Sequence, residues 1–332
     1  MISEQDIIAT YSGKKVLITG GAGFIGSALA HALVAVGAEV TILDAMLPLY
    51  GGNMFNLRGI ENDIEFIEGD IRDEELVEKV VAGKDFIFDF AAQVSHIDSK
   101  DQPLLDLDIN GRGHLLVLEA VRKHAPHAKV LFSSSRMVYG KILSTPVDET
   151  HPTQPLSIYG VHKVLAEMYY RYYFDVFNTH TIIARLPTPY GPRAHMKHPK
   201  YSVVNWFLRQ SLDGETIKIF GDGTQSRDYI YIDDVVDAFL RLGVGGTPGE
   251  IYNLGTTEKM RLVDMVDAIL LETKTGSKEH VPYPDHYVVA NFGDYIANYD
   301  KIRTTVAWEP QISLEEGVRK MVAYYAQHRK FY

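Results

Sequence analysis

The sequence predicts an α/β protein in which a doubly wound parallel sheet carries a smaller lobe of mixed helices and strands. Three observations support this fold class. Short β-rich segments alternate with helical segments over the first half of the chain, a glycine-rich turn follows the first strand, and the alternation ends after residue 186. Such alternation is typical of a parallel sheet covered by helices on both faces. We expect residues 1–186 to form the sheet domain and residues 187–332 to form mainly the second lobe, with some later segments returning to the sheet.

The expected strands are short and apolar on both faces, as burial between two helical layers requires. In chain order they span residues 15–19, 39–43, 64–68, 86–90, 129–133, 181–185 and 217–220. The expected helices place apolar residues three and four positions apart. They span residues 24–36, 73–81, 108–124, 157–177, 203–213, 233–242, 262–273 and 313–328.

The composition limits the partners and the chemistry. The chain has 332 residues, a net charge of −10 and no cysteine. The acidic balance disfavours nucleic acids and anionic membranes, but local cations can still bind an anionic small molecule. Without cysteine there are no disulfides, thiolate nucleophiles or cysteine-based zinc sites, and the histidine pairs lack further ligands, so we expect no metal. No signal peptide or membrane span is found, so we expect a cytoplasmic protein.

A glycine-rich turn links the first strand to the next helix. Gly20, Gly23 and Gly26 permit a tight turn, the approach of a diphosphate and close packing of helix and strand. The helix N-terminus offers free N–H groups to phosphates. Asp44 ends the second strand, where a carboxylate binds ribose hydroxyls and repels a 2′-phosphate. The sequence therefore predicts a Rossmann domain that binds NAD rather than NADP.

Tyr159 and Lys163 are one helical turn apart and lie on one helix face. A nearby ammonium lowers the pKa of a tyrosine, which lets the phenol act as a base. Tyr11 and Lys15 have the same spacing but precede a strand, so we regard that match as coincidental. Ser135 follows the fifth strand, where open α/β sheets bind ligands. We interpret Ser135, Tyr159 and Lys163 as catalytic; the alternative is a loop-capping serine and a packing tyrosine.

These residues belong to a longer set of motifs through which the chain resembles a known family. It is similar over nearly its whole length to extended short-chain dehydrogenase/reductases that act on nucleotide-diphosphate sugars, of the UDP-glucose 4-epimerase type. The motifs are residues 19–26 (TGGAGFIG), 69–73 (GDIRD), 91–93 (AAQ), 133–135 (SSS) with 138–140 (VYG), 159 with 163, 190–193 (YGPR), and 227–229 (RDY) with 233–234 (DD).

The resemblance implies roles for individual residues. Asp70 and Ile71 would contact the adenine, Ser135 and Tyr159 would hold the sugar 4-hydroxyl, and Arg227 would pair with the substrate diphosphate. The expected NAD site consists of Gly20, Gly23, Phe24, Ile25, Gly26, Asp44, Asp70, Ile71, Ala91, Ala92, Gln93, Tyr159 and Lys163. The expected substrate site consists of Gln93, Ser135, Arg136, Tyr159, Thr188, Arg193 and Arg227.

Two positions depart from the family pattern. Thr188 stands where the family often has asparagine, and Asn291 stands where it often has a second arginine. Both positions usually touch substrate. We hypothesise that Arg193, His195 or Lys197 supplies the missing positive charge.

The residues after Ser135 bear on the reaction. Family 4,6-dehydratases carry an acid and a base there, whereas this chain has Arg136 and Met137, and methionine cannot abstract a proton. We expect an NAD-dependent 4-epimerase of a UDP-hexose or UDP-uronic acid that acts through a transient 4-keto sugar. The alternatives are a 2-epimerase, a decarboxylase, a dehydratase, or a non-catalytic NAD-binding protein. We expect Arg136 to face solvent; alternatively it meets a uronate carboxylate.

The family also suggests the oligomeric state. In it, helices equivalent to residues 108–124 and 157–177 pack against their copies as a four-helix interface. We therefore expect a homodimer.

Overall fold

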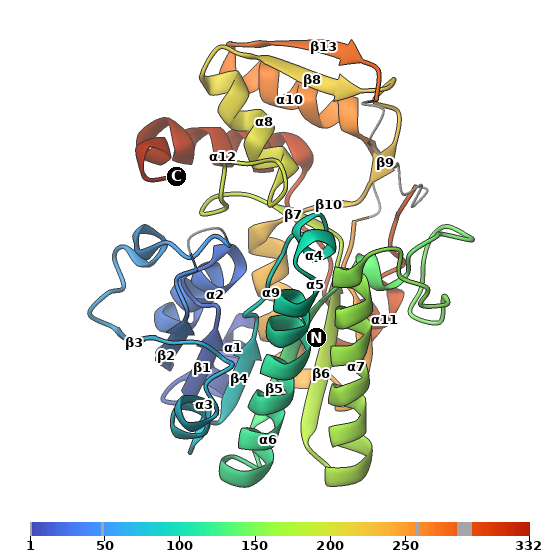
Figure 1. Ribbon diagram of the computed structural model, residues 1–332. Coiled ribbons are helices and arrows are strands. Elements are labelled where there is room, and N and C mark those ends of the chain that lie inside the picture. Colours follow the sequence, from blue (N-terminus) through green and yellow to red (C-terminus); the bar gives the residue numbers. More distant parts are fainter. Residues whose placement is uncertain (1, 48–49, 257–258, 284–293) are drawn as a thin grey trace.

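The computed structural model describes residues 2–47, 50–256, 259–283 and 294–332. At its centre lies a seven-stranded sheet in the order β11-β6-β5-β4-β1-β2-β3 (Figure 1). All neighbouring pairs in it are parallel. The strands are β1 (Lys15–Thr19), β2 (Glu39–Asp44), β3 (Ile64–Glu68), β4 (Phe86–Asp89), β5 (Lys129–Ser135), β6 (His180–Leu186) and β11 (Ile251–Asn253). The order from β3 to β6 is that of a doubly wound dinucleotide-binding sheet, so the expected fold class is confirmed.

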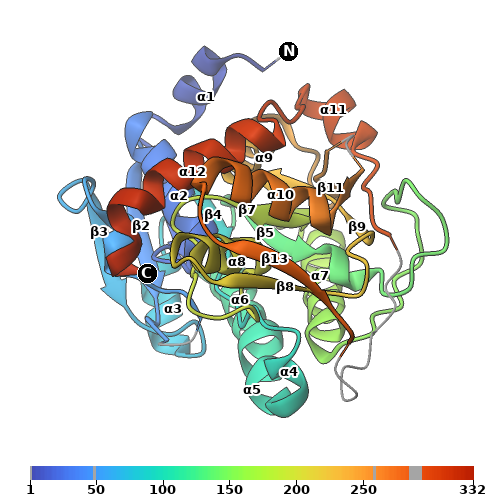
Figure 2. The same cartoon turned by 90° about the horizontal axis from the view of Figure 1, so that it is seen from above.

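Helices cover both faces of this sheet (Figures 1 and 2). In β1, Val16 and Ile18 belong to the core on the side of α2 and α9, while Leu17 belongs to the core beneath α3, α6 and α7. All three side chains are fully buried. Because side chains alternate along a strand, only a sheet covered on both faces buries them all. The main helices are α1 (Glu4–Tyr11), α2 (Phe24–Ala35), α3 (Glu74–Val81), α6 (His114–His124), α7 (Ile158–Phe177) and α9 (Ile232–Gly245).

A smaller lobe lies above the carboxyl ends of the strands (Figure 1). In it β8 and β13 pair in parallel. Strands β7 with β10 and β9 with β12 form two further short pairs. The elements of this region are β7 (Thr188–Tyr190), α8 (Val203–Leu212), β8 (Thr216–Phe220), β9 (Ser226–Arg227), β10 (Tyr229–Tyr231), β12 (Met260–Arg261), α10 (Leu262–Thr273), β13 (Ser277–Val281) and α12 (Leu314–His328). Both α9 and β11 return to the sheet, and the division at residue 186 stays a prediction.

The expected elements agree with the structure within three residues, with one clear exception. The helix expected over 108–124 begins as a π-helical segment, η2 (Asp108–Gly113), before α6. Sequence analysis also missed α1, although Ser3 and Asp6 form a capping box at its start. The remaining short elements are η1 (Met54–Leu57), α4 (Asp98–Asp101), α5 (Pro103–Leu107), η3 (Arg136–Val138), α11 (Asp300–Val306) and η4 (Arg329–Phe331).

A buried ion pair fixes α7 to the sheet. Arg185 on β6 donates two hydrogen bonds to Glu167 on α7, at 2.9 and 2.6 Å, and both side chains are about 5% exposed or less. Ser134 donates to the same carboxylate at 2.5 Å. The guanidinium also lies 4.7 Å from the centre of the Tyr139 ring. This arrangement sets the position of α7, which carries Tyr159 and Lys163.

We predict that Arg185→Met destabilises the protein by about 3–5 kcal/mol, because it leaves the Glu167 carboxylate buried without its partner. The urea midpoint measures the effect. Arg303→Met is the matched control, since Arg303 pairs with Asp300 at the exposed surface and its loss costs no more than about 1 kcal/mol. Equal shifts in the two variants would contradict the prediction.

Candidate active site

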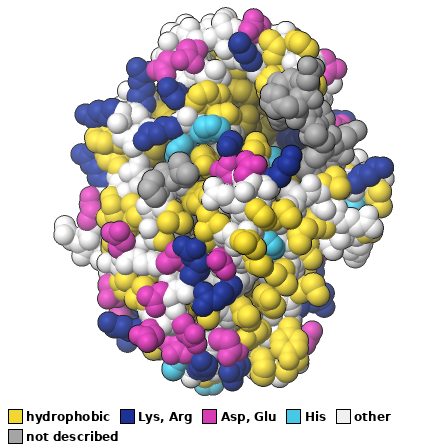
Figure 3. Space-filling model, in the orientation of Figure 1, with side chains coloured by type: hydrophobic (Ala, Val, Ile, Leu, Met, Phe, Trp, Pro, Cys, Tyr) yellow, Lys and Arg dark blue, Asp and Glu magenta, His cyan; other side chains and the backbone are white. Residues whose placement is uncertain are grey.

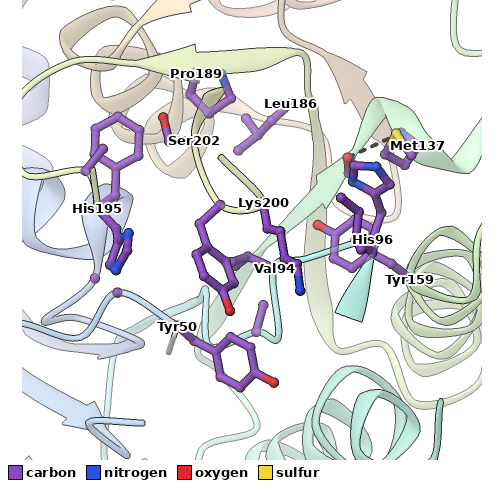
Figure 4. A pocket seen from close by; sticks show the side chains of 18 of the residues that line it. Tyr50, Val94, His96, Met137, Tyr159, Leu186, Pro189, His195, Lys200 and Ser202 are labelled. Carbon is purple, nitrogen blue, oxygen red and sulfur yellow. Dashed lines mark hydrogen bonds between the residues drawn. The ribbon is translucent and has the colours of Figure 1, made fainter. Parts of the chain in front are cut away.

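A cavity of about 1550 Å³ lies where the strands end and the lobe begins. Its walls come from the glycine-rich turn, the ends of β2, β4 and β5, the start of α7, and the segment between β7 and α8. In Figure 4, Tyr159, His96 and Met137 gather on one side and His195 lies on the opposite side. The cavity is lined by these expected site residues: Gly20, Gly23, Phe24, Ile25, Gly26, Asp44, Asp70, Ile71, Ala91, Ala92, Ser135, Arg136, Tyr159, Lys163, Thr188 and Arg227.

The glycine-rich turn leaves no room for side chains. Gly20 has a φ of +69°, and a Cβ atom there would lie 2.9 Å from the backbone of Ala91. A Cβ atom on Gly26 would lie 2.3 Å from the carbonyl oxygen of Gly20. Gly23 precedes α2 without a side-chain cap, so the first N–H groups of the helix are available to an anion. The turn therefore fits a dinucleotide diphosphate.

Asp44 ends β2 at the wall of the same cavity. One carboxylate oxygen accepts from the Ala22 N–H and the other from the Met46 N–H, both at 2.9 Å. Burial raises the pKa of Asp44, and these backbone hydrogen bonds oppose that shift. Each oxygen keeps a second acceptor position. The geometry can accommodate a pair of ribose hydroxyls, and the contact of Asp44 with the ribose stays a prediction.

Asp70 and Ile71 lie further along the cavity wall. Asp70 accepts a two-pronged contact from Arg72, with Nε at 2.9 Å and Nη2 at 2.6 Å. Burial alone would raise the pKa of Asp70, but Arg72 holds it below the usual value. The carboxylate is thus fixed in place beside the buried side chain of Ile71.

Gln93 is placed differently from the other expected residues. It does not line the cavity, and its side-chain amide forms two hydrogen bonds with the backbone of Ser95. Its own backbone exchanges hydrogen bonds with the side chain of Asn110, a fully buried residue of η2. The sequence analysis did not identify Asn110 as a residue that positions Gln93. Gly111 and Gly113, inside the expected helix, were a signal of irregular backbone at this point.

Ser135, Tyr159 and Lys163 come together at one end of the cavity. Ser135 Oγ accepts from the Met137 N–H at 3.2 Å, and its hydroxyl lies near enough to the Tyr159 phenol to lower the pKa of that group. Lys163 is 2% exposed and donates to the Ser133 carbonyl at 2.9 Å. Its ammonium lies 5.9 Å from the centre of the Tyr159 ring.

Burial dominates the acid–base properties of this group. It raises the pKa of Tyr159 above its usual value, and the nearby Ser135 hydroxyl offsets this only in part. Burial also lowers the pKa of Lys163 to about 8, against the opposite effect of nearby carboxylates. The expected depression of the tyrosine pKa by the ammonium is therefore not present in the protein alone.

Arg136 corrects one expectation. We expected it to face bulk solvent, but it is half-buried in the cavity wall, with its guanidinium carbon 5.5 Å from the centre of the buried Tyr295 ring. Arg227 lines the same cavity and donates to the Ser226 carbonyl and to Gln225. The cavity thus contains two neighbouring guanidinium groups.

The other residues considered for substrate binding are dispersed. Arg193 lies outside the large cavity, in a small pocket of about 190 Å³ together with His195 and Lys197; His195 also lines the large cavity. Thr188 lines the large cavity and donates its N–H to the Asp228 carbonyl at 3.0 Å. Asn291 lies outside the described residues.

The sequence analysis missed a set of polar contacts that joins the two sides of the cavity. Lys200, between β7 and α8, pairs with Asp98 at the start of α4 at 2.8 Å, and the Tyr201 hydroxyl donates to the same carboxylate at 2.8 Å. Asp98 and Lys200 are 102 residues apart, so no local sequence pattern predicts their contact. The link ties the lobe to the sheet domain beside the cavity.

Comparison with known proteins agrees with this geometry. Residues 16–255 match the family model "NAD dependent epimerase/dehydratase family". A UDP-glucose 4-epimerase of Mycolicibacterium smegmatis is 36% identical over 94% of this chain and 98% of its own. A UDP-glucose 4-epimerase structure from Thermotoga maritima, solved with UDP-glucose, is 32% identical, with a TM-score of 0.86 over 94% of this chain and 99% of that one.

A third relative carries a different activity. A dTDP-glucose 4,6-dehydratase structure from Streptomyces venezuelae, solved with NAD bound, is 29% identical, with a TM-score of 0.87 over 96% of this chain and 98% of that one. The chain belongs to the NAD-dependent epimerase/dehydratase family of extended short-chain dehydrogenase/reductases that act on nucleotide sugars. Its cofactor is NAD, as the sequence predicts.

Two further searches of the described residues gave no candidates. None of their helices combines the length and the apolar character that a membrane span needs. No three histidine or acidic side chains among them converge as a metal site would require.

We predict that Asp44→Asn reduces the preference for NAD over NADP by about tenfold or more, because the amide no longer repels a 2′-phosphate or forms charged hydrogen bonds to the ribose. Fluorescence titration of the protein with each cofactor measures the ratio. Asp70→Asn is the control: its carboxylate is held by Arg72, and we expect its NAD-to-NADP ratio to stay unchanged. An unaltered ratio in Asp44→Asn would count against a ribose contact.

Proposed function

We propose that the protein is an NAD-dependent nucleotide-sugar 4-epimerase that acts on a UDP-hexose or UDP-uronic acid through a transient 4-keto sugar. The observation that carries this proposal is the wall beside Ser135 and Tyr159. It presents Arg136 and the nearly buried Met137, neither of which abstracts a proton from carbon. Among the described lining residues the carboxylates are Asp44, Asp70 and Asp101, which lie on β2, after β3 and on α4.

In the proposed mechanism Tyr159 removes the proton of the sugar 4-hydroxyl, while Ser135 holds that hydroxyl by a hydrogen bond. When bound, NAD supplies a hydride acceptor and donor for carbon 4. Loss of the hydroxyl proton and of a hydride from carbon 4 converts the carbinol to a ketone. Return of the hydride to the opposite face of carbon 4, and of the proton to the oxygen, inverts the centre. Lys163 holds its ammonium beneath the phenol, where positive charge favours the phenolate.

The acid–base data are compatible with this order of events. Burial keeps the Tyr159 phenol protonated in the protein alone. The Tyr159 phenol therefore needs additional positive charge near its ring before it loses its proton and can act as a base. A cationic cofactor provides such charge. We infer that Tyr159 becomes an effective base only in the loaded enzyme, which prevents idle proton exchange in the empty one.

We predict that Tyr159→Phe lowers kcat by about 10²- to 10⁴-fold, because the variant lacks the group that moves the proton. The wild type is incubated with UDP-glucose, UDP-N-acetylglucosamine and UDP-glucuronate, and the products are separated by mass and stereochemistry. An isomer of unchanged mass supports the proposal, whereas loss of water or carbon dioxide identifies a dehydratase or a decarboxylase instead. Tyr169→Phe, which removes a hydroxyl from the same helix outside the cavity, should keep full activity.

We also propose that the protein is a homodimer and that it is located in the cytoplasm. Exposed apolar side chains form a stripe along α7, made of Val161, Met168, Tyr172 and Val176, each 45–64% exposed. Figure 3 shows apolar side chains gathered over this part of the surface. A contiguous apolar patch of this kind is typical of an interface with another protein.

We predict that Met168→Arg combined with Val176→Arg yields a monomer, because two charges cannot be buried unpaired in an apolar interface. Light scattering after size exclusion gives the mass, which should fall from that of two chains to that of one. Leu271→Arg is the control, since Leu271 is 77% exposed on α10, away from the stripe. A monomeric wild type would contradict the proposal.

A further inference from the structure

Arg136 stands next to the expected reaction centre. It opens η3 directly after Ser135, the last residue of β5. The side chain lies along the cavity wall, where the fully buried Tyr295 ring supports its guanidinium. Ser135 and Tyr159 are the proposed holders of the sugar 4-hydroxyl, so the guanidinium reaches substituents on the sugar ring rather than the nucleotide.

The charge of this guanidinium lacks a paired carboxylate among the residues that the structure describes. Asp228 acts on the charge of Arg136, but its carboxylate is held by the N–H groups of Thr256 and Ala297. Burial raises the pKa of Asp228 to about 7, so it carries only part of a negative charge at neutral pH.

The surroundings add positive charge instead. Burial and the neighbouring Arg227 lower the pKa of Arg136 to about 10, which still leaves it cationic at neutral pH. The exposed imidazole of His96 also lines this cavity, and desolvation and the charge of Arg136 lower its pKa, which favours the neutral form. A partly desolvated cation without a counter-ion is costly. The cost is offset when a bound anion completes the pair.

The residues present point to the chemical class of that anion. Arg227 is the expected partner of the substrate diphosphate, which leaves Arg136 for a second negative group. A guanidinium fork matches the two oxygens of a carboxylate. On a hexose ring, a carboxylate at carbon 6 is attached to carbon 5, the neighbour of the reacting carbon 4. It therefore falls beside the residue that follows Ser135.

We propose that Arg136 is a specificity-determining residue that binds the carbon-6 carboxylate of a nucleotide-diphosphate uronic acid. The chain then epimerises a uronic acid in preference to the neutral hexose. This inference rests on the proposed 4-epimerase function and narrows its substrate class.

The test compares kcat/KM for glucuronate and glucose carried on the same nucleotide, with UDP, dTDP and GDP as carriers. The wild type should prefer the glucuronate member by about 10- to 100-fold, the range expected for charged hydrogen bonds. Arg136→Met should remove that preference, so that the ratio of kcat/KM for the glucuronate member to that for the glucose member falls to about 1. Arg136→Lys keeps the charge without the fork and should retain part of the preference. Arg319→Gln, at an exposed position on α12, should behave as wild type.

The inference is overturned if the wild type prefers the neutral member of each pair, or if Arg136→Met lowers both members equally. If none of these nucleotide sugars is epimerised, the proposed function fails separately. In that case calorimetry can still measure how tightly the glucuronate and glucose members bind to the NAD-loaded protein, and this decides the role of Arg136. Tighter binding of the glucuronate member that is lost in Arg136→Met supports the carboxylate contact, and equal binding of both members excludes it.

Discussion

The burial of one ammonium group shapes the interior of the sheet domain. Lys163 lies almost entirely out of water, and a buried cation is stable only where acids and hydrogen bonds compensate for the lost hydration. Three carboxylates raise the pKa of Lys163 against the effect of burial: Asp89, Asp106 and Glu167. Each of them sits on a different element, at the end of β4, on α5 and on α7. The charge thus couples the sheet to the helices beside it.

Each of these carboxylates is in turn held by its own partners. Asp89 accepts from Thr19 at 2.6 Å, from Tyr170 at 2.5 Å and contacts His114 at 2.8 Å, all fully buried. Burial alone would raise the pKa of Asp89, but these contacts hold it below the usual value. The Thr19 hydroxyl also accepts from the N–H groups of Phe90 and Ala91. The network beneath Lys163 therefore positions the backbone that packs against Gly20.

The glycine-rich turn and the group of Ser135, Tyr159 and Lys163 consequently share one framework. Ala91 lies so close to Gly20 that any side chain on the glycine would collide with its backbone, and its position depends on Thr19 and Asp89. Glu167 anchors α7 through Arg185, and α7 carries both Tyr159 and Lys163. Loss of one of the buried polar groups should therefore affect the turn and this group together, since members of a buried polar network depend on one another.

The sequence predicts only those features of the site that depend on a local pattern of residues. The bounds of β1 and α10 follow from the spacing of apolar residues, and the glycine turn and the Tyr159–Lys163 spacing are likewise local. The contact of Asp98 with Lys200 joins segments 102 residues apart, so only the fold reveals it. Gln93 belongs to a recognisable motif, yet its backbone partner Asn110 turns it out of the cavity wall.

Arg136 shows the same limit most clearly, because an arginine in sequence is normally taken to be solvated. The guanidinium of Arg136 packs on the ring of Tyr295, which comes from a distant segment of the chain. No carboxylate among the described residues forms an ion pair with it. The protein as a whole carries a net charge of −10, yet its large cavity is lined by the cationic side chains of Arg136, Arg227 and Lys163. Global charge therefore tells little about the ligand, and the local cations argue for a substrate with more than one anionic group.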